Sequence, residues 1–177
     1  MMTSSGPRPK SAAVADDVFV EPARFDGTNI NPTTLLATDY LNHFNEAVML
    51  LEMLPMAPDC KEDFLDWHAM SYVEHFSASR FKHRDLAIAA YEVADPAFRG
   101  PLDQLANQMN RILTETRDGL KSDLSHDTIR MLAETTVGWV KPMVARAGAV
   151  INGELEEAAP QDAVDALFDR RVAALCA

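Results

Sequence analysis

Residues 34–54 read TLLATDYLNHFNEAVMLLEML, and this stretch decides the fold because it describes a long amphipathic helix. At about 100° per residue, six of its apolar side chains share one face. They are Leu36, Tyr40, Phe44, Ala47, Leu51 and Leu54. Thr33 or Thr34 can cap the start of this helix. Pro55 and Pro58 end it. The stretch therefore predicts a helix that packs one face into a helical core.

The same kind of pattern continues along the chain. We predict further helices over residues 59–79, 82–94, 101–120 and 126–151. Asp95-Pro96 is typical of a cap and first turn, but Gly100-Pro101 is expected to interrupt a helix that starts there, so the fourth helix should begin near Pro101. Ser125 is the expected cap of the fifth helix, and Pro142 is expected to kink it. No segment has the pattern of a strand, so the sequence predicts an all-α antiparallel bundle of four to five helices.

The pattern divides the chain into four segments. Residues 1–32 are rich in proline and poor in apolar side chains, and we expect a mostly disordered arm. Residues 33–151 form the bundle, residues 152–159 an acidic linker, and residues 160–177 a separate amphipathic helix. The apolar side of that last helix is expected to dock on a partner or on the bundle itself. Its residues are Val164, Leu167, Phe168, Val172 and Leu175.

Composition excludes several classes of protein. The formal net charge of −11 argues against non-specific binding to nucleic acid or to an anionic membrane. No apolar run approaches the roughly 18 residues that a membrane span needs, and the first residues lack the apolar region of a secretory signal. Cys60 and Cys176 are two lone thiols without the spacing of a disulfide framework or a metal site. We therefore expect a cytoplasmic protein that binds neither nucleic acid nor membrane.

Four of the five histidines fall on the apolar stripes of the first three predicted helices. They are His43, His68, His75 and His83. Asp39, His43 and Glu46 are spaced i, i+4 and i+7, so they form one strip of the first helix. His68, Tyr72 and His75 repeat this spacing on the second helix, where the histidines are expected to face the core. An unpartnered polar group costs roughly 1–3 kcal/mol to bury, so each ring needs a partner.

Two interpretations of these histidines stay open. In the first, imidazoles and carboxylates from facing helices bind iron, manganese or zinc. The ligands would be Asp39, His43, Glu46, His68 and His75. In the second, which we favour, the rings form a polar network that fixes how the helices pack. Tyr72, Glu74 and His83 would belong to that network. The paired Glu-x-x-His motifs of ferritin-like bundles and the His-x-x-x-His pattern of other metal-binding bundles do not occur in the chain.

No motif in the chain names a reaction. There is no Gly-x-Ser-x-Gly turn for a nucleophilic serine and no phosphate-binding glycine loop. We therefore expect a non-catalytic regulatory or adaptor protein without a cofactor, which acts through contacts with another protein or with a second copy of itself. The alternative is a helical bundle that binds a metal or another cofactor.

Overall fold

The computed structural model describes residues 25–155, and this part of the chain is mostly helical. The helices are η2 (Thr38–Tyr40), α2 (Leu41–Met53), α3 (Cys60–Asp66), α4 (Tyr72–Ala78), α5 (Arg84–Val93), α6 (Pro96–Leu120) and α7 (His126–Ile151). The only β-pairing within the described residues is an isolated bridge between Ile30 and Ala37. The predicted all-α class is therefore confirmed for this part of the chain.

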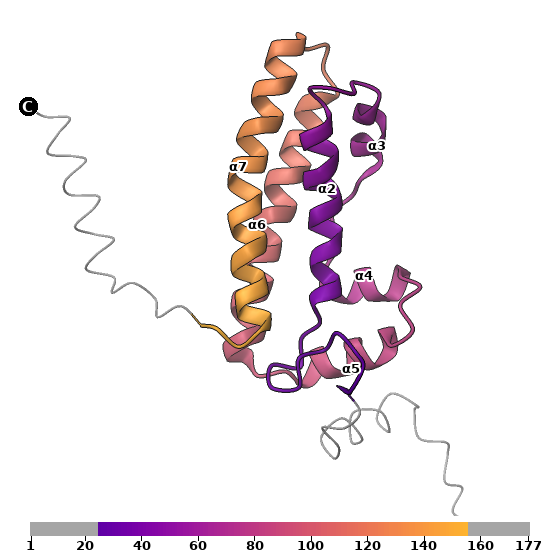
Figure 1. Cartoon of the computed structure of the whole chain (residues 1–177), viewed down its shortest axis with the longest axis vertical. Coiled ribbons are helices and arrows are strands. Elements are labelled where there is room, and N and C mark those ends of the chain that lie inside the picture. Colours follow the sequence, from indigo (N-terminus) through magenta and orange to yellow (C-terminus); the bar gives the residue numbers. More distant parts are fainter. Residues whose placement is uncertain (1–24, 156–177) are drawn as a thin grey trace, which may run out of the picture.

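Three long helices, α2, α6 and α7, lie side by side (Figure 1). Helices α6 and α7 form a hairpin across residues 121–125, and α2 packs against α7 in the opposite chain direction. Leu41 at the start of α2 lies beside Gly148 near the end of α7, whereas Glu52 near the end of α2 accepts a hydrogen bond from Lys141. Helix α3 packs against α2 and α6, and α4, beside the lower end of α2, packs against α5 beneath it.

The first helix buries the face that its sequence predicts. All six predicted core side chains, from Leu36 to Leu54, are at most 1% exposed. They meet apolar side chains of the other helices, such as Phe64, Met109 and Val140, which are also buried. Burial of one amphipathic face thus accounts for the position of α2 in the core.

The first helix begins later than predicted. Leu35 has a positive φ of 61°, a conformation that no helix contains. The Asn31 side chain holds this turn by accepting hydrogen bonds from the backbone N–H groups of Thr33 and Thr34. The Thr34 hydroxyl donates to the Ile151 carbonyl at 2.6 Å, so it does not cap a helix. The chain enters its first helical turn only at Thr38.

The predicted second helix, residues 59–79, is wrong as a single element, since it consists of α3 and α4 with a break at residues 67–71. Trp67 is extended where α3 ends, and its side chain is buried. Ser71 then starts α4 with a capping box: its hydroxyl accepts from the Glu74 N–H, and the Glu74 carboxylate accepts from the Ser71 N–H. This second start signal is present in the sequence and outweighs the helical spacing of the flanking residues.

The predicted start of the fourth helix near Pro101 is also wrong. Asp95 accepts a hydrogen bond from the Ala97 N–H, and α6 runs unbroken from Pro96 through Pro101 to Leu120. The other boundaries agree with prediction: α5 lies within residues 82–94, and Ser125 caps α7 by accepting from the Thr128 N–H. Residues 1–24 and 156–177, including the expected arm and the expected last helix, lie outside the described residues.

Candidate functional site

Among the predicted site residues, His43 is the most deeply buried histidine. It lies on α2, its side chain is 4% exposed, and its ring stacks on Trp67 with centroids 4.8 Å apart. The Trp67 indole N–H donates to the His43 carbonyl oxygen at 3.2 Å. The His75 ring lies 5.9 Å from the His43 ring. The break after α3 therefore places Trp67 where it covers the imidazole on α2.

Burial makes both inner imidazoles weak bases. Burial, with a smaller effect from the neighbouring His75 and His68 rings, lowers the pKa of His43 to about 4. Burial also lowers the pKa of His75, although the Asp39 carboxylate opposes this shift. Both rings are therefore neutral at pH 7. The Nε2 atom of His43 and the Oδ2 atom of Asp39 are buried and make no hydrogen bond.

The five predicted metal ligands do not come together. His43, Glu46 and His68 line a cavity of about 190 Å³ between α2 and α3, whereas Asp39 and His75 lie outside it. Within residues 25–155, no three His, Cys, Asp or Glu side chains are placed so that they could share a metal ion. The prediction that His68 faces the core is wrong, because α3 ends at Asp66 and leaves the His68 ring exposed.

The residues predicted for a polar network lie in different surroundings. The buried Tyr72 hydroxyl accepts from the Ala37 N–H at 2.9 Å, which joins α4 to the segment before α2. Glu74 instead lies at the surface in the capping box of α4, and its bonds from Ser71 lower the pKa of its carboxyl. His83 is half-buried beside Phe81, just before α5. Around Tyr72 and His43, these contacts are typical of residues that fix helix packing.

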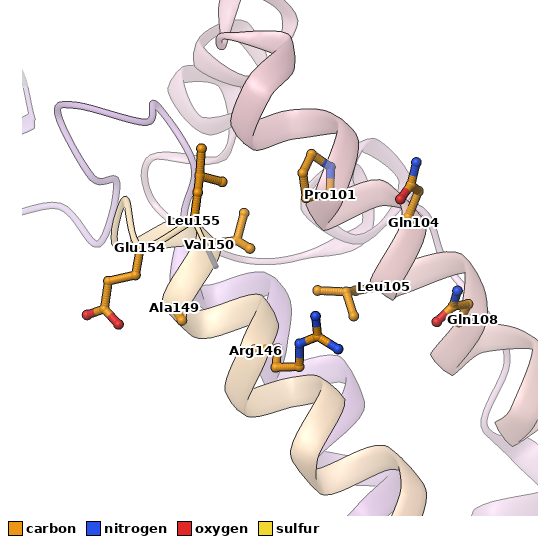
Figure 2. A pocket seen from close by; sticks show the side chains of 9 residues that line it. All are labelled: Pro101, Gln104, Leu105, Gln108, Arg146, Ala149, Val150, Glu154 and Leu155. Carbon is orange, nitrogen blue, oxygen red and sulfur yellow. The ribbon is translucent and has the colours of Figure 1, made fainter. Parts of the chain in front are cut away.

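A larger feature lies on another face, between α6 and α7. A cavity of about 500 Å³ opens there, where α7 ends (Figure 2), and we call it the lower cavity. Leu105 points from α6 toward α7, and Arg146 points back from α7. The lining consists of Pro101, Gln104, Leu105, Gln108, Arg146, Ala149, Val150, Glu154 and Leu155.

A second cavity, of about 420 Å³, lies farther along the same two helices, and we call it the upper cavity. Its lining consists of Ile112, Glu115, Thr116, Gly119, Thr128, Met131, Leu132, Thr135, Thr136 and Trp139. On each helix the residues of both cavities recur at i, i+3 and i+4, apart from one gap on α7 between Trp139 and Arg146, so they share one face. The two cavities therefore lie along one face of the α6/α7 hairpin, and we call this face, with its two cavities, the α6/α7 groove.

Sequence patterns did not identify the α6/α7 groove. Trp139 on its rim is 59% exposed and Met131 is 63% exposed. The sequence allows Trp139 either to pack at the end of a bundle or to mark an exposed contact patch. The exposure of Trp139 supports the contact patch. Trp67, for which the same two possibilities hold, is buried.

Comparisons of the chain with protein-family models, with curated proteins and with solved structures give no match. The function must therefore be inferred from the residues and geometry of the chain itself. No helix within residues 25–155 is long and apolar enough to cross a membrane.

Proposed function

We propose that the protein is a small, cytoplasmic, non-catalytic regulatory or adaptor protein that binds the apolar side of a partner protein's helix in the α6/α7 groove. The observation that carries this proposal is the exposure of Trp139 and Met131 beside the apolar lining of the groove. Large apolar side chains gathered on one surface are typical of interaction sites. Tryptophan is also enriched among the residues that dominate binding energy.

Helix binding suits the shape of this surface. Two antiparallel helices with cavities along one shared face accept a third helix, whose side chains at i, i+3, i+4 and i+7 fill the cavities. Ile112, Leu132 and Trp139 would contact the apolar side chains of such a helix, and Glu115 and Arg146 would meet its charged ones. The net charge of −11 disfavours nucleic acid and anionic membranes as alternative partners.

A metal- or cofactor-binding function is the weaker candidate. His43 and His75 are close together, but the carboxylates Asp39 and Glu46 do not join them around one point within the described residues. The geometry of the histidines instead supports a role in packing.

The test uses the full chain as bait and compares two variants. A partner captured from cell extract is identified, purified and titrated with the chain by calorimetry. Met131→Ala combined with Trp139→Ala should weaken this binding at least tenfold, because truncating a central anchor costs about 2 kcal/mol or more. The control combines Met49→Ala with Met56→Ala, two exposed methionines outside the groove, and should bind as the wild type does.

Two outcomes would contradict the proposal. One is a partner that binds the groove variant with unchanged affinity. The other is the absence of any partner whose purified form binds the chain. If the chain instead forms a dimer that the groove variant dissociates in light scattering, the partner is a second copy of this chain.

A further inference from the structure

We infer that in the free protein the α6/α7 groove is occupied by the chain's own residues 161–175, folded as a helix that a partner must displace. The docking itself is independent of any partner, whereas its regulatory consequence rests on the proposed function. Three features support this occupant: the place where the described chain ends, the length of the remaining segment, and the pattern of charged and apolar residues in that segment.

The described chain ends inside the groove. Helix α7 stops at Ile151, and Glu154 and Leu155 line the lower cavity (Figure 2). Residues 156–160 connect this point to the amphipathic segment. Five residues span up to about 17 Å, which is enough for the chain to turn back along α7. The segment therefore starts next to the surface that it would cover.

The segment is long enough to cover most of the α6 side of the groove. Fifteen helical residues span about 22 Å at 1.5 Å per residue. The groove residues of α6 run from Pro101 to Gly119, which corresponds to about 27 Å on the same basis. A helix over residues 161–175 would thus cover the lower cavity and reach the level of Trp139, which lies about 18 Å before the end of α7.

When the segment runs back along α7, its charged and apolar residues match those of the groove. A segment that returns along α7 places Asp165, at the edge of its apolar side, near Arg146 of the lower cavity. It places Arg171 near the exposed Glu115 of the upper cavity. Its apolar residues, from Val164 to Leu175, would then face Leu105, Ile112 and Trp139.

The rest of the fold leaves this face for the segment. Helix α2 packs against α7, and α3 packs against α6. Within residues 25–155, neither α2 nor α3 contributes a residue to the lining of the α6/α7 groove. A helix in the groove would pack against two long helices at once, which is the arrangement that most effectively removes an amphipathic face from water.

The docked helix predicts which side chains lie close together. Thr135 lines the upper cavity about 24 Å before the end of α7, and Cys176 would lie about 22 Å beyond Gln161. In the full chain with Cys60→Ser, Thr135→Cys creates one partner for the native thiol of Cys176. A short bismaleimide should join the two thiols within one chain, which is read as a mass increase of the monomer. The matched control is Met56→Cys, which places a highly exposed thiol outside the groove.

We expect at least fivefold more intramolecular crosslink with Thr135→Cys than with Met56→Cys. Adding Leu167→Asp and Phe168→Asp on the apolar side of the segment should reduce the crosslink to the control level. Ala166→Asp with Ala173→Asp introduces the same charge on the opposite side and should leave it unchanged. Equal crosslinking of Thr135→Cys and Met56→Cys would overturn the inference, and so would crosslinked dimers in place of monomers.

This experiment uses the purified chain alone, so its failure is distinct from failure of the proposed function. A partner could still bind an open groove if the crosslink were absent. If the segment docks in the groove and a partner binds there too, Leu167→Asp with Phe168→Asp should raise the affinity for the purified partner at least threefold. The reason is that the partner no longer competes with the segment. An unchanged affinity would overturn the regulatory role.

Discussion

His43 is a polar residue whose side chain is buried among aromatic rings. Its ring lies between the Trp67 indole and the rings of Phe44 and His75. A protonated imidazole here would lose most of its hydration, which is why burial lowers its pKa to about 4. The nearest histidine, His75, also has a lowered pKa. Protonation and folding must therefore oppose each other at this position.

We expect stability to fall with pH because of this residue. The unfolded His43 binds a proton near pH 6.5 and the folded one near pH 4, so between these values the unfolded state binds more protons. The free energy of unfolding should decrease as pH falls from about 6.5 to 4, by at most about 3 kcal/mol from His43. His43→Phe keeps an aromatic ring against Trp67 and cannot titrate, so this decrease should become smaller.

Urea unfolding at several pH values between 7.5 and 4.5 measures this effect. The residual slope of His43→Phe should reflect His75, whose pKa burial also lowers. The control is His126→Gln, which removes an exposed imidazole at the start of α7. A His43→Phe variant with the full wild-type slope would show that His43 does not control the acid sensitivity.

At the scale of the element, the two longest helices contain residues that ordinarily weaken helices. Pro101 lies inside α6, and Pro142 lies inside α7. Gly138 lies one turn before Pro142, at the position whose carbonyl a proline ring crowds. A Cβ atom at Gly138 would meet no atom within 4 Å. The glycine is thus not required for close packing within the described structure.

We expect Gly138→Ala to raise the free energy of unfolding by about 0.5–1 kcal/mol, because alanine restricts the unfolded chain more than glycine does. Gly27→Ala makes the same chemical change at a residue with φ of +72°, and it should lower stability instead. Thermal and urea unfolding of both variants measure these two opposite changes in the free energy of unfolding. A destabilised Gly138→Ala would mean that Pro142 requires a glycine at this position.

At the scale of the whole molecule, one hydrogen bond joins distant parts of the chain. The buried Thr34 hydroxyl donates to the carbonyl of Ile151 at 2.6 Å, across 117 residues of sequence. Phe25 and Ile30, which precede it, are buried in the same core. The segment before α2 is thereby held against the end of α7, next to the point where the chain leaves the described structure.

We expect Thr34→Val to lower the free energy of unfolding by about 1–2 kcal/mol, since the Ile151 carbonyl would lose a buried donor. Thr33→Val is the matched control, because Thr33 is exposed and its side chain should contribute little. Chemical unfolding of both variants, followed by circular dichroism, tests the difference. Equal stability of the two variants would contradict a role for this bond.

The helical class and the core face of the first helix could be read from sequence. Residues 34–54 repeat apolar side chains at the helical period, and that period places Tyr40 to Leu54 on one buried face, whereas Leu36 is buried by the turn before the helix. The caps of α4, α6 and α7 also depend on nearby residues, such as Ser71 and Ser125. Such features are local, because each is decided by side chains within one or two turns.

Only the tertiary structure decided where the sites lie. Trp67 leaves the helical path of α3 and covers His43, and the same break exposes His68. Both histidines fall on predicted apolar stripes, yet His43 is buried and His68 is exposed. The α6/α7 groove likewise depends on which faces α2 and α3 cover, and no periodicity within α6 or α7 specifies that choice. Burial is a property of contacts between distant segments, whereas sequence patterns report only which side of a helix is apolar.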